Sequence, residues 1–133
     1  MEKKNRLLIV DDDTTSLMEI IGILKNDYTI STAKNGLAAI DNIERLPPDL
    51  VLLDIIMPGL NGYDVMTKLK QSPATEDLPI ILISGAIGID DERKGLALGA
   101  IDYLRKPYDE GIVKLRVDYH IKMINKIREL SKL

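Results

Sequence analysis

The sequence predicts an α/β fold with a parallel sheet, on the basis of two observations. Five short apolar runs rich in β-branched residues recur along the 133-residue chain, and several are apolar throughout, as is typical of strands covered on both faces. Segments with apolar residues at helical spacing lie between these runs. This repeated alternation indicates a parallel sheet with crossover helices, and the length suits a single domain.

The first half of the chain contains three predicted strands, at residues 7–10, 28–32 and 50–53. The helix after the first strand has one apolar stripe, Leu17, Ile20, Ile21 and Leu24. Ser16 and Glu19 predict a capping box near its start. The second helix has the stripe Leu37, Ala38, Ile40 and Ile43, and it ends before the Pro47-Pro48 pair.

The second half contains predicted strands at residues 79–83 and 101–104. A third helix, with the stripe Val65, Met66 and Leu69, precedes them and stops before Pro73. Gly99 marks the end of a fourth helix. A last helix is expected from about residue 110 to residue 133, because after Gly111 neither proline nor glycine interrupts the helical spacing.

Composition excludes several classes of protein. The chain has no cysteine and a single histidine, so disulfide scaffolds, thiolate zinc sites and His-rich metal sites are excluded. The net charge is −3, and the acidic body argues against direct binding of nucleic acid. We see no signal peptide and no apolar run long enough for a membrane span, which predicts a cytoplasmic protein with no membrane partner.

Polar side chains follow four of the five predicted strands. Asp11, Asp12 and Asp13 follow the first strand, Asp54 the third, Ser84 the fourth and Lys106 the fifth. Ligands of such sheets bind beyond the carboxyl ends of the strands, so these groups should meet. A few oxygen ligands favour Mg²⁺ over a Ca²⁺ cage. Carboxylates, a cation, a lysine and a hydroxyl together indicate a phosphoryl ligand.

Two interpretations differ in which carboxylate attacks phosphorus. The stretch Asp11-x-Asp13-x-Thr15 matches the nucleophile motif of haloacid-dehalogenase-like Mg²⁺ phosphatases, with Asp11 as nucleophile. That family needs a further acidic pair after another strand, whereas only one helical segment follows Lys106. It also leaves Asp54 without a role.

The alternative uses every strand end. Residues 5 to about 125 resemble the receiver domain of bacterial response regulators, of the chemotaxis-regulator type. The matching motifs are IVDDD, LLDIIMPGLNG, ILISGA and GAIDYLRKPY, in the family's order and spacing. The resemblance implies a doubly wound, flavodoxin-like, five-stranded parallel sheet in the order 2-1-3-4-5 with helices on both faces. It also implies a phosphorylation-controlled signalling module rather than an enzyme, or an adaptor that signals without phosphorylation.

The resemblance assigns the reacting group and the metal ligands. Asp54 corresponds to the phosphoryl acceptor. Asp11 and Asp12 correspond to the acid pair that holds Mg²⁺ with Asp54, and Ile56 would add its backbone carbonyl. In this family the positions of Ile56 and Ala86 flank the water that hydrolyses the phosphoryl group. Neither side chain can hydrogen-bond that water, which predicts slow self-dephosphorylation.

Ser84 and Lys106 correspond to the family's hydroxyl and lysine, and Tyr103 corresponds to its aromatic switch residue. The resemblance also predicts a cis bond between Lys106 and Pro107. On phosphorylation, Ser84 should move toward the phosphoryl oxygens and Tyr103 should turn inward, which would change the surface of the fourth helix, fifth strand and fifth helix. Asp13, outside the acid pair, is interpreted as a helix N-cap, and His120 as a helix-surface residue.

The expected partner is a histidine kinase or a phosphotransfer protein. We assign residues 1–123 to the receiver domain and 124–133 to an extension of the last helix. Val113, Val117 and Ile121 should pack on the domain, whereas Ile124, Ile127 and Leu130 have little left to cover. The extension should therefore pair weakly with a second copy, lead into an effector domain, or fray.

Overall fold

Strands and helices alternate strictly along the chain. The computed structural model describes residues 3–85 and 89–133, and within them the order of elements is β1 (Arg6–Val10), α1 (Thr14–Leu24), β2 (Thr29–Ala33), α2 (Gly36–Arg45), β3 (Leu50–Asp54), α3 (Gly62–Lys70), β4 (Ile80–Ser84), α4 (Ile89–Ala97), β5 (Asp102–Arg105) and α5 (Glu110–Ser131). The predicted strands are confirmed, with ends that differ by one residue at most.

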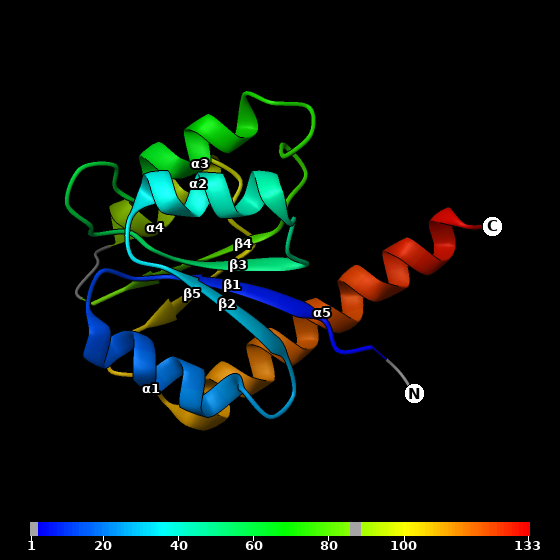
Figure 1. Ribbon diagram of the computed structural model, residues 1–133, viewed down its shortest axis with the longest axis horizontal. Coiled ribbons are helices and arrows are strands. Elements are labelled where there is room, and N and C mark those ends of the chain that lie inside the picture. Colours follow the sequence, from blue (N-terminus) through cyan, green and yellow to red (C-terminus); the bar gives the residue numbers. More distant parts are fainter. Residues whose placement is uncertain (1–2, 86–88) are drawn as a thin grey trace.

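The strands form one parallel sheet in the order β2-β1-β3-β4-β5, which confirms the predicted topology. Helices α2, α3 and α4 cover one face and α1 and α5 cover the other (Figure 1). Because all five strands run the same way, the residues that follow them gather at one edge of the sheet.

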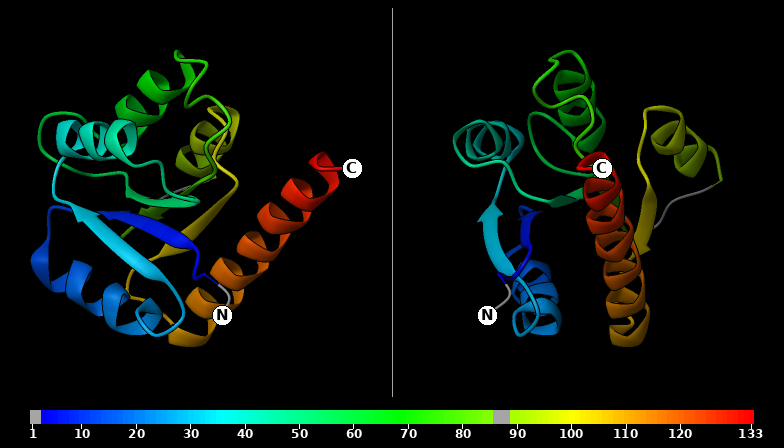
Figure 2. Two further views of the ribbon diagram at one scale, coloured as in Figure 1. Left: turned by 45° about the vertical axis from the view of Figure 1, so that its right-hand side comes forward. Right: turned by 90° about the vertical axis from the view of Figure 1, so that its right-hand side faces the viewer.

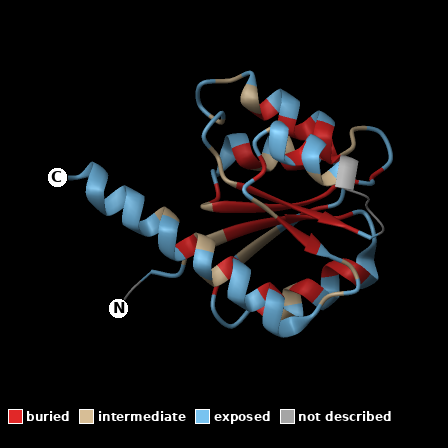
Figure 3. Cartoon of the chain, turned by 180° about the vertical axis from the view of Figure 1, so that it is seen from behind, coloured by how far each residue is buried: buried red, intermediate tan, exposed pale blue. Residues whose placement is uncertain are grey.

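Each face of the sheet has its own apolar core. On β1, Leu8 and Val10 pack toward α2 and α3, whereas Leu7 and Ile9 pack toward α1 and α5. The central strands are buried along their whole length (Figure 3). This burial on both faces explains why these strands are apolar throughout instead of alternating.

The start of α1 corrects one prediction and confirms another. Asp13 is the N-cap, and its carboxylate accepts a hydrogen bond of 3.1 Å from the Thr15 backbone N–H. The predicted capping box of Ser16 and Glu19 is wrong, because the helix has already begun at Thr14 and Ser16 is buried within it. Asp13 directly precedes the helix, so its carboxylate reaches the free N–H groups of the first turn.

Helix α5 has the predicted inner face, with Val113, Val117 and Ile121 buried against the sheet. Its last turns extend past the sheet (Figure 2). The prediction for Ile124 is wrong, because this side chain is partly buried against the core. The prediction of His120 as a helix-surface residue is wrong: its side chain is only 15% exposed, with Nε2 2.9 Å from Asp102 Oδ2 at the start of β5.

Candidate functional site

The four polar strand ends converge as predicted. Asp11 directly follows β1, Asp54 ends β3, Ser84 ends β4 and Lys106 directly follows β5. The Lys106 backbone N–H donates to the Ser84 carbonyl at 2.8 Å, which fixes the chain as it leaves β5. The Lys106–Pro107 peptide bond is cis, as predicted.

Lys106 joins two carboxylates that come from different strands. Its Nζ lies 2.9 Å from Asp54 Oδ2 and 3.0 Å from Asp11 Oδ2. The Asp11 side chain is fully buried and that of Asp54 nearly so, while the lysine side chain is 23% exposed. The ammonium group therefore balances negative charge that water hardly reaches.

Backbone amides hold the other oxygen of each carboxylate. Asp11 Oδ1 accepts from the Asp13 N–H at 2.9 Å, and Asp54 Oδ1 accepts from the Ile56 N–H at 3.1 Å. Each acid therefore folds the chain back toward itself just after its strand. The carboxylates are held in fixed orientations, with their second oxygens near Lys106.

Burial and hydrogen bonding shift the pKa values of the two carboxylates in opposite directions, and the net result differs between Asp54 and Asp11. Burial raises the pKa of Asp54 to about 6, with Lys106 opposing the shift and the neighbouring Asp11 adding to it. Burial would also raise the pKa of Asp11, but hydrogen bonds from the Asp13 N–H, Lys106 and Ser16 outweigh it and lower that pKa. Burial would lower the pKa of Lys106, but both carboxylates raise it. Asp11 is the better-stabilised anion of the pair.

Asp12 completes a group of three carboxylates. One oxygen from each of Asp11, Asp12 and Asp54 lies within 4.8 Å of the others, and Asp12 is exposed while the other two are buried. Three carboxylate oxygens, open to solvent on one side, fit a hard divalent cation that keeps several waters. The Ile56 side chain is 69% exposed, and the predicted role of its carbonyl stays a prediction.

Ser84 supplies an independent indication of a ligand. Its hydroxyl oxygen is buried and has no hydrogen-bond partner among the described residues. Leaving a buried hydroxyl unpaired is unfavourable. An incoming oxygen at this edge of the sheet would satisfy it.

Two residues near the site were not predicted. The Ser16 hydroxyl lies 3.2 Å from the Tyr108 hydroxyl, which connects α1 to the segment after Lys106, and Ser16 helps to lower the pKa of Asp11. Ser16 lies four residues before Ile20 and therefore on the buried face of α1. A polar residue in that position is the available signal in the sequence, although a serine there also fits a helix cap.

Tyr103 lies apart from the carboxylates, in the core beneath α4. Its hydroxyl donates to the Asp91 carbonyl at 2.7 Å and contacts the Glu92 carbonyl at 3.0 Å. The sequence predicts that this ring turns inward on phosphorylation. In this structure the ring is already buried. Ala86, the other predicted neighbour of the hydrolytic water, lies outside the described residues.

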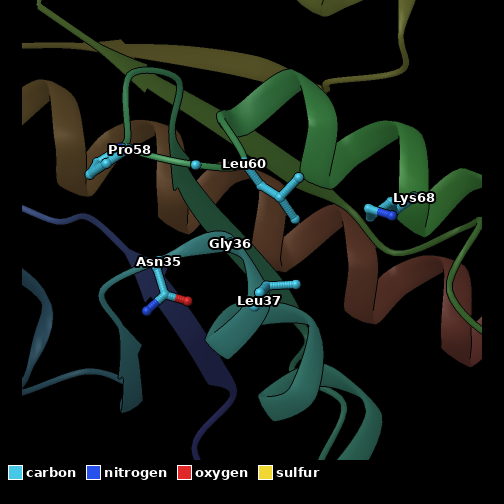
Figure 4. A pocket seen from close by; sticks show the side chains of 7 residues that line it. Asn35, Gly36, Leu37, Pro58, Leu60 and Lys68 are labelled. Atoms are coloured by element: carbon cyan, nitrogen blue, oxygen red, sulfur yellow. The ribbon is translucent and has the colours of Figure 1, made fainter.

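A separate pocket of about 550 Å³ lies between the start of α2 and the loop after β3 (Figure 4). It is lined by Asn35, Gly36, Leu37, Pro58, Gly59, Leu60 and Lys68. None of the four strand-end residues lines it. The carboxylate edge, rather than this pocket, is therefore the candidate site.

Comparison with known proteins identifies the family. The model of the response regulator receiver domain matches residues 7–118. This chain belongs to that family. The receiver resembles the response regulator PleD of Caulobacter vibrioides, with 39% identity over 84% of the chain, and PilH of Pseudomonas aeruginosa, with 37% identity over 79%. A CheY-like receiver domain protein of Methanospirillum hungatei has a solved structure with a TM-score of 0.85 and 25% identity, covering 93% of this chain and 98% of that one.

The receiver spans 25% of the length of PleD but 88% of PilH. Membership places it in two-component signalling, as a response regulator domain. The alternative of a haloacid-dehalogenase-like phosphatase is not supported. That motif pairs Asp11 with Asp13, whereas the Asp13 carboxylate is occupied as the N-cap of α1. Within the described residues, no helix has the length and apolar character required to cross a membrane.

Proposed function

We propose that this receiver accepts a phosphoryl group on Asp54 from a histidine kinase or a phosphotransfer protein, in a reaction that requires Mg²⁺. The observation that carries the proposal is the position of Lys106 Nζ, within 3.0 Å of the Asp54 and Asp11 carboxylates. The buried Ser84 hydroxyl at the end of the neighbouring strand β4, unpaired among the described residues, adds a donor for a phosphoryl oxygen.

Each residue of the site has a separate role in the proposed reaction. An Asp54 oxygen attacks phosphorus, so that an O–P bond forms while the N–P bond of the donor phosphohistidine breaks. Lys106 pairs with the transferred oxygens, and Ser84 donates a hydrogen bond to one of them. Asp11, Asp12 and Asp54, with the Ile56 carbonyl, would hold Mg²⁺, which supplies positive charge to the same oxygens. The site is open on the side of Asp12, where a donor can approach.

The proposed output is a change of surface rather than turnover of a substrate. Phosphorylation would draw Ser84 toward the phosphoryl oxygens and alter the face formed by α4, β5 and α5, where the Tyr103 ring is already buried. We place the receiver in the cytoplasm, with residues 1–123 as the signalling domain and 124–133 as an extension for self-pairing or connection to an effector. Direct contact with nucleic acid or a membrane is not part of this function.

Intact-mass spectrometry after incubation with acetyl phosphate and Mg²⁺ tests the proposal. The wild type should gain one phosphoryl group, and the gain should be absent with EDTA or in Asp54→Ala. Asp27→Ala, which removes an exposed carboxylate far from the strand ends, is the matched control and should still be labelled. Labelling of Asp54→Ala to the wild-type level would refute the assignment.

A further inference from the structure

Two buried tyrosine hydroxyls donate to the same carbonyl. Tyr63 of α3 donates to the Asp91 carbonyl of α4 at 3.1 Å, and Tyr103 of β5 donates to that carbonyl at 2.7 Å. Their side chains come from different elements, and both are at least nine-tenths buried. The first turn of α4 is thus held from two sides at one atom.

Tyr63 is attached closely to the backbone of Asp54. Its neighbour Gly62 donates its N–H to the Ile55 carbonyl at 2.8 Å. A Cβ at Gly62 would lie 2.6 Å from the Asp54 carbonyl oxygen, so only glycine lets α3 start this near to that strand end. A displacement of the chain at Asp54 must therefore move the start of α3.

The start of α3 is itself rigid. Asn61 and Asp64 form a reciprocal capping box, with hydrogen bonds of 2.9 and 3.1 Å. In such a box, each side chain accepts a hydrogen bond from the backbone N–H of the other residue, so two otherwise free N–H groups are satisfied. Tyr63 lies inside this turn and moves with it.

The α4 side of the contact is shaped for these two rings. A Cβ at Gly95 would lie 2.0 Å from the Tyr103 hydroxyl oxygen, so the tyrosine occupies the space that a side chain would take. Lys94 Nζ lies 4.5 Å from the centre of the Tyr63 ring, in position for a cation–π contact. Consecutive α4 residues thus contact the two tyrosines.

We propose that Tyr63 is a second positioning residue of the switch, which connects the Asp54 loop to α4 through the carbonyl that Tyr103 also binds. The proposal rests on the function proposed above. Movement that follows phosphorylation reaches α4 by two routes, through β5 and Tyr103 and through the start of α3 and Tyr63. Removal of the Tyr63 hydroxyl alone keeps the packed ring and its contact with Lys94, and removes the hydrogen bond to the Asp91 carbonyl.

Amide hydrogen exchange of residues 91–99 tests this, in Tyr63→Phe and in the control Tyr119→Phe, whose ring is 58% exposed on α5. In the free protein, Tyr63→Phe should speed α4 exchange about two- to tenfold, the effect of one net hydrogen bond. With Mg²⁺ and beryllofluoride, an analogue of the phosphoryl group, its α4 response should shrink while amides at Ser84 and Lys106 respond as in the wild type.

The double variant Tyr63→Phe/Tyr103→Phe tests the shared acceptor. Because both hydroxyls bind one carbonyl, the two effects on α4 exchange should be non-additive. Additive effects, or Tyr63→Phe behaviour equal to that of Tyr119→Phe in both states, would overturn the inference. If the wild-type amides at Ser84 and Lys106 did not respond to beryllofluoride, the proposed function would be refuted, and with it any movement transmitted to α4. The comparison of Tyr63→Phe with the wild type in the free protein would still decide whether Tyr63 anchors α4.

Discussion

The ammonium group of Lys106 lies 2.9 Å from the carboxylate of Asp54, although 51 residues separate them in the chain. The same nitrogen lies 3.0 Å from Asp11. Two buried carboxylates thus share one cation, and a metal ion with Asp12 as a further ligand would add the positive charge that the group needs. The stability of the metal-free receiver should therefore depend on this lysine.

Replacing Lys106 with methionine keeps much of the side-chain volume and removes the charge. In EDTA, Lys106→Met should lower the free energy of unfolding by about 3 kcal/mol, because Asp11 and Asp54 are left unpaired. Mg²⁺ should restore more stability to this variant than to the wild type. Urea denaturation with and without Mg²⁺ measures both effects, and Lys122→Met, at an exposed position on α5, should change stability by less than about 0.5 kcal/mol.

Two helix glycines should respond oppositely to alanine. Gly95→Ala places a methyl group 2.0 Å from the Tyr103 hydroxyl and should cost about 1–3 kcal/mol. Gly22→Ala in α1 meets nothing within 4 Å and should stabilise the helix by about 0.5–1 kcal/mol. Urea unfolding of both variants measures the contrast. If Gly95→Ala were as stable as Gly22→Ala, α4 would not be seated on Tyr103 as described.

The fold and the strand-end groups followed from local patterns. Asp54, Ser84 and Lys106 could be placed together because every parallel strand delivers its last residues to one edge of the sheet. The capping error at Ser16 shows the limit of such patterns. Asp13 and Ser16 could both cap the same helix from their residue types. The structure shows Asp13 as the cap because the first turn begins directly after it.

Contacts between distant side chains had no local signal. Tyr63 and Tyr103 meet at Asp91 because α3, β5 and α4 pack together, and no spacing in the sequence encodes that meeting. The same holds for Asn5 and Asn125, whose side-chain amides pair reciprocally at 3.0 and 3.2 Å. Residue types predict which groups can bond, whereas tertiary packing selects the partner.

The lifetime of the phosphoryl group should depend on Ile56. Its backbone N–H binds Asp54, and its side chain is 69% exposed beside that carboxylate. An asparagine there could orient a water by one hydrogen bond, so Ile56→Asn should speed dephosphorylation about fivefold. Loss of the phosphoryl mass over time measures the rate. An Ile56→Leu variant should decay like the wild type, and an unchanged or slower decay in Ile56→Asn would contradict the prediction.

Low pH should weaken the contacts of Asp49 with Arg6 of β1 and with Arg128 of α5. Asp49 accepts from the Arg6 N–H at 2.7 Å and pairs with Arg128. Burial would raise the pKa of Asp49, but these partners outweigh it and lower that pKa. A lowered folded-state pKa means that the stabilisation is present above the unfolded value of 3.8 and is lost as pH falls through the folded value.

Asp49→Asn should therefore be less stable than the wild type by about 1 kcal/mol at neutral pH, and the difference should close below about pH 4. Urea denaturation of both proteins at neutral pH and below pH 4 measures the stability difference under each condition. Asp27→Asn, at an exposed position, is the control. A gap of constant size from neutral to acid pH would show that the carboxylate charge of Asp49 is not what stabilises the contact.

The last turns of α5 have one anchored face and one open face. Asn125 pairs with Asn5 and Arg128 pairs with Asp49, which holds the extension against the body of the receiver. Ile127 and Leu130 remain 60% and 66% exposed. Figure 3 shows this end of the helix as exposed almost throughout. An anchored helix with an exposed apolar pair favours contact with a second copy over a frayed end.

Self-association should be weak, because so short a helix supports only a marginal coiled coil, and phosphorylation should strengthen it. Sedimentation of the full chain, and of a version ending at Met123, each with and without beryllofluoride, measures this. The full chain should gain mass with beryllofluoride, whereas the shortened version should stay monomeric. Ile127→Ser/Leu130→Ser keeps the anchors at Asn125 and Arg128 and should also be monomeric. Equal monomer mass in every sample would remove self-pairing and leave the extension as a connector.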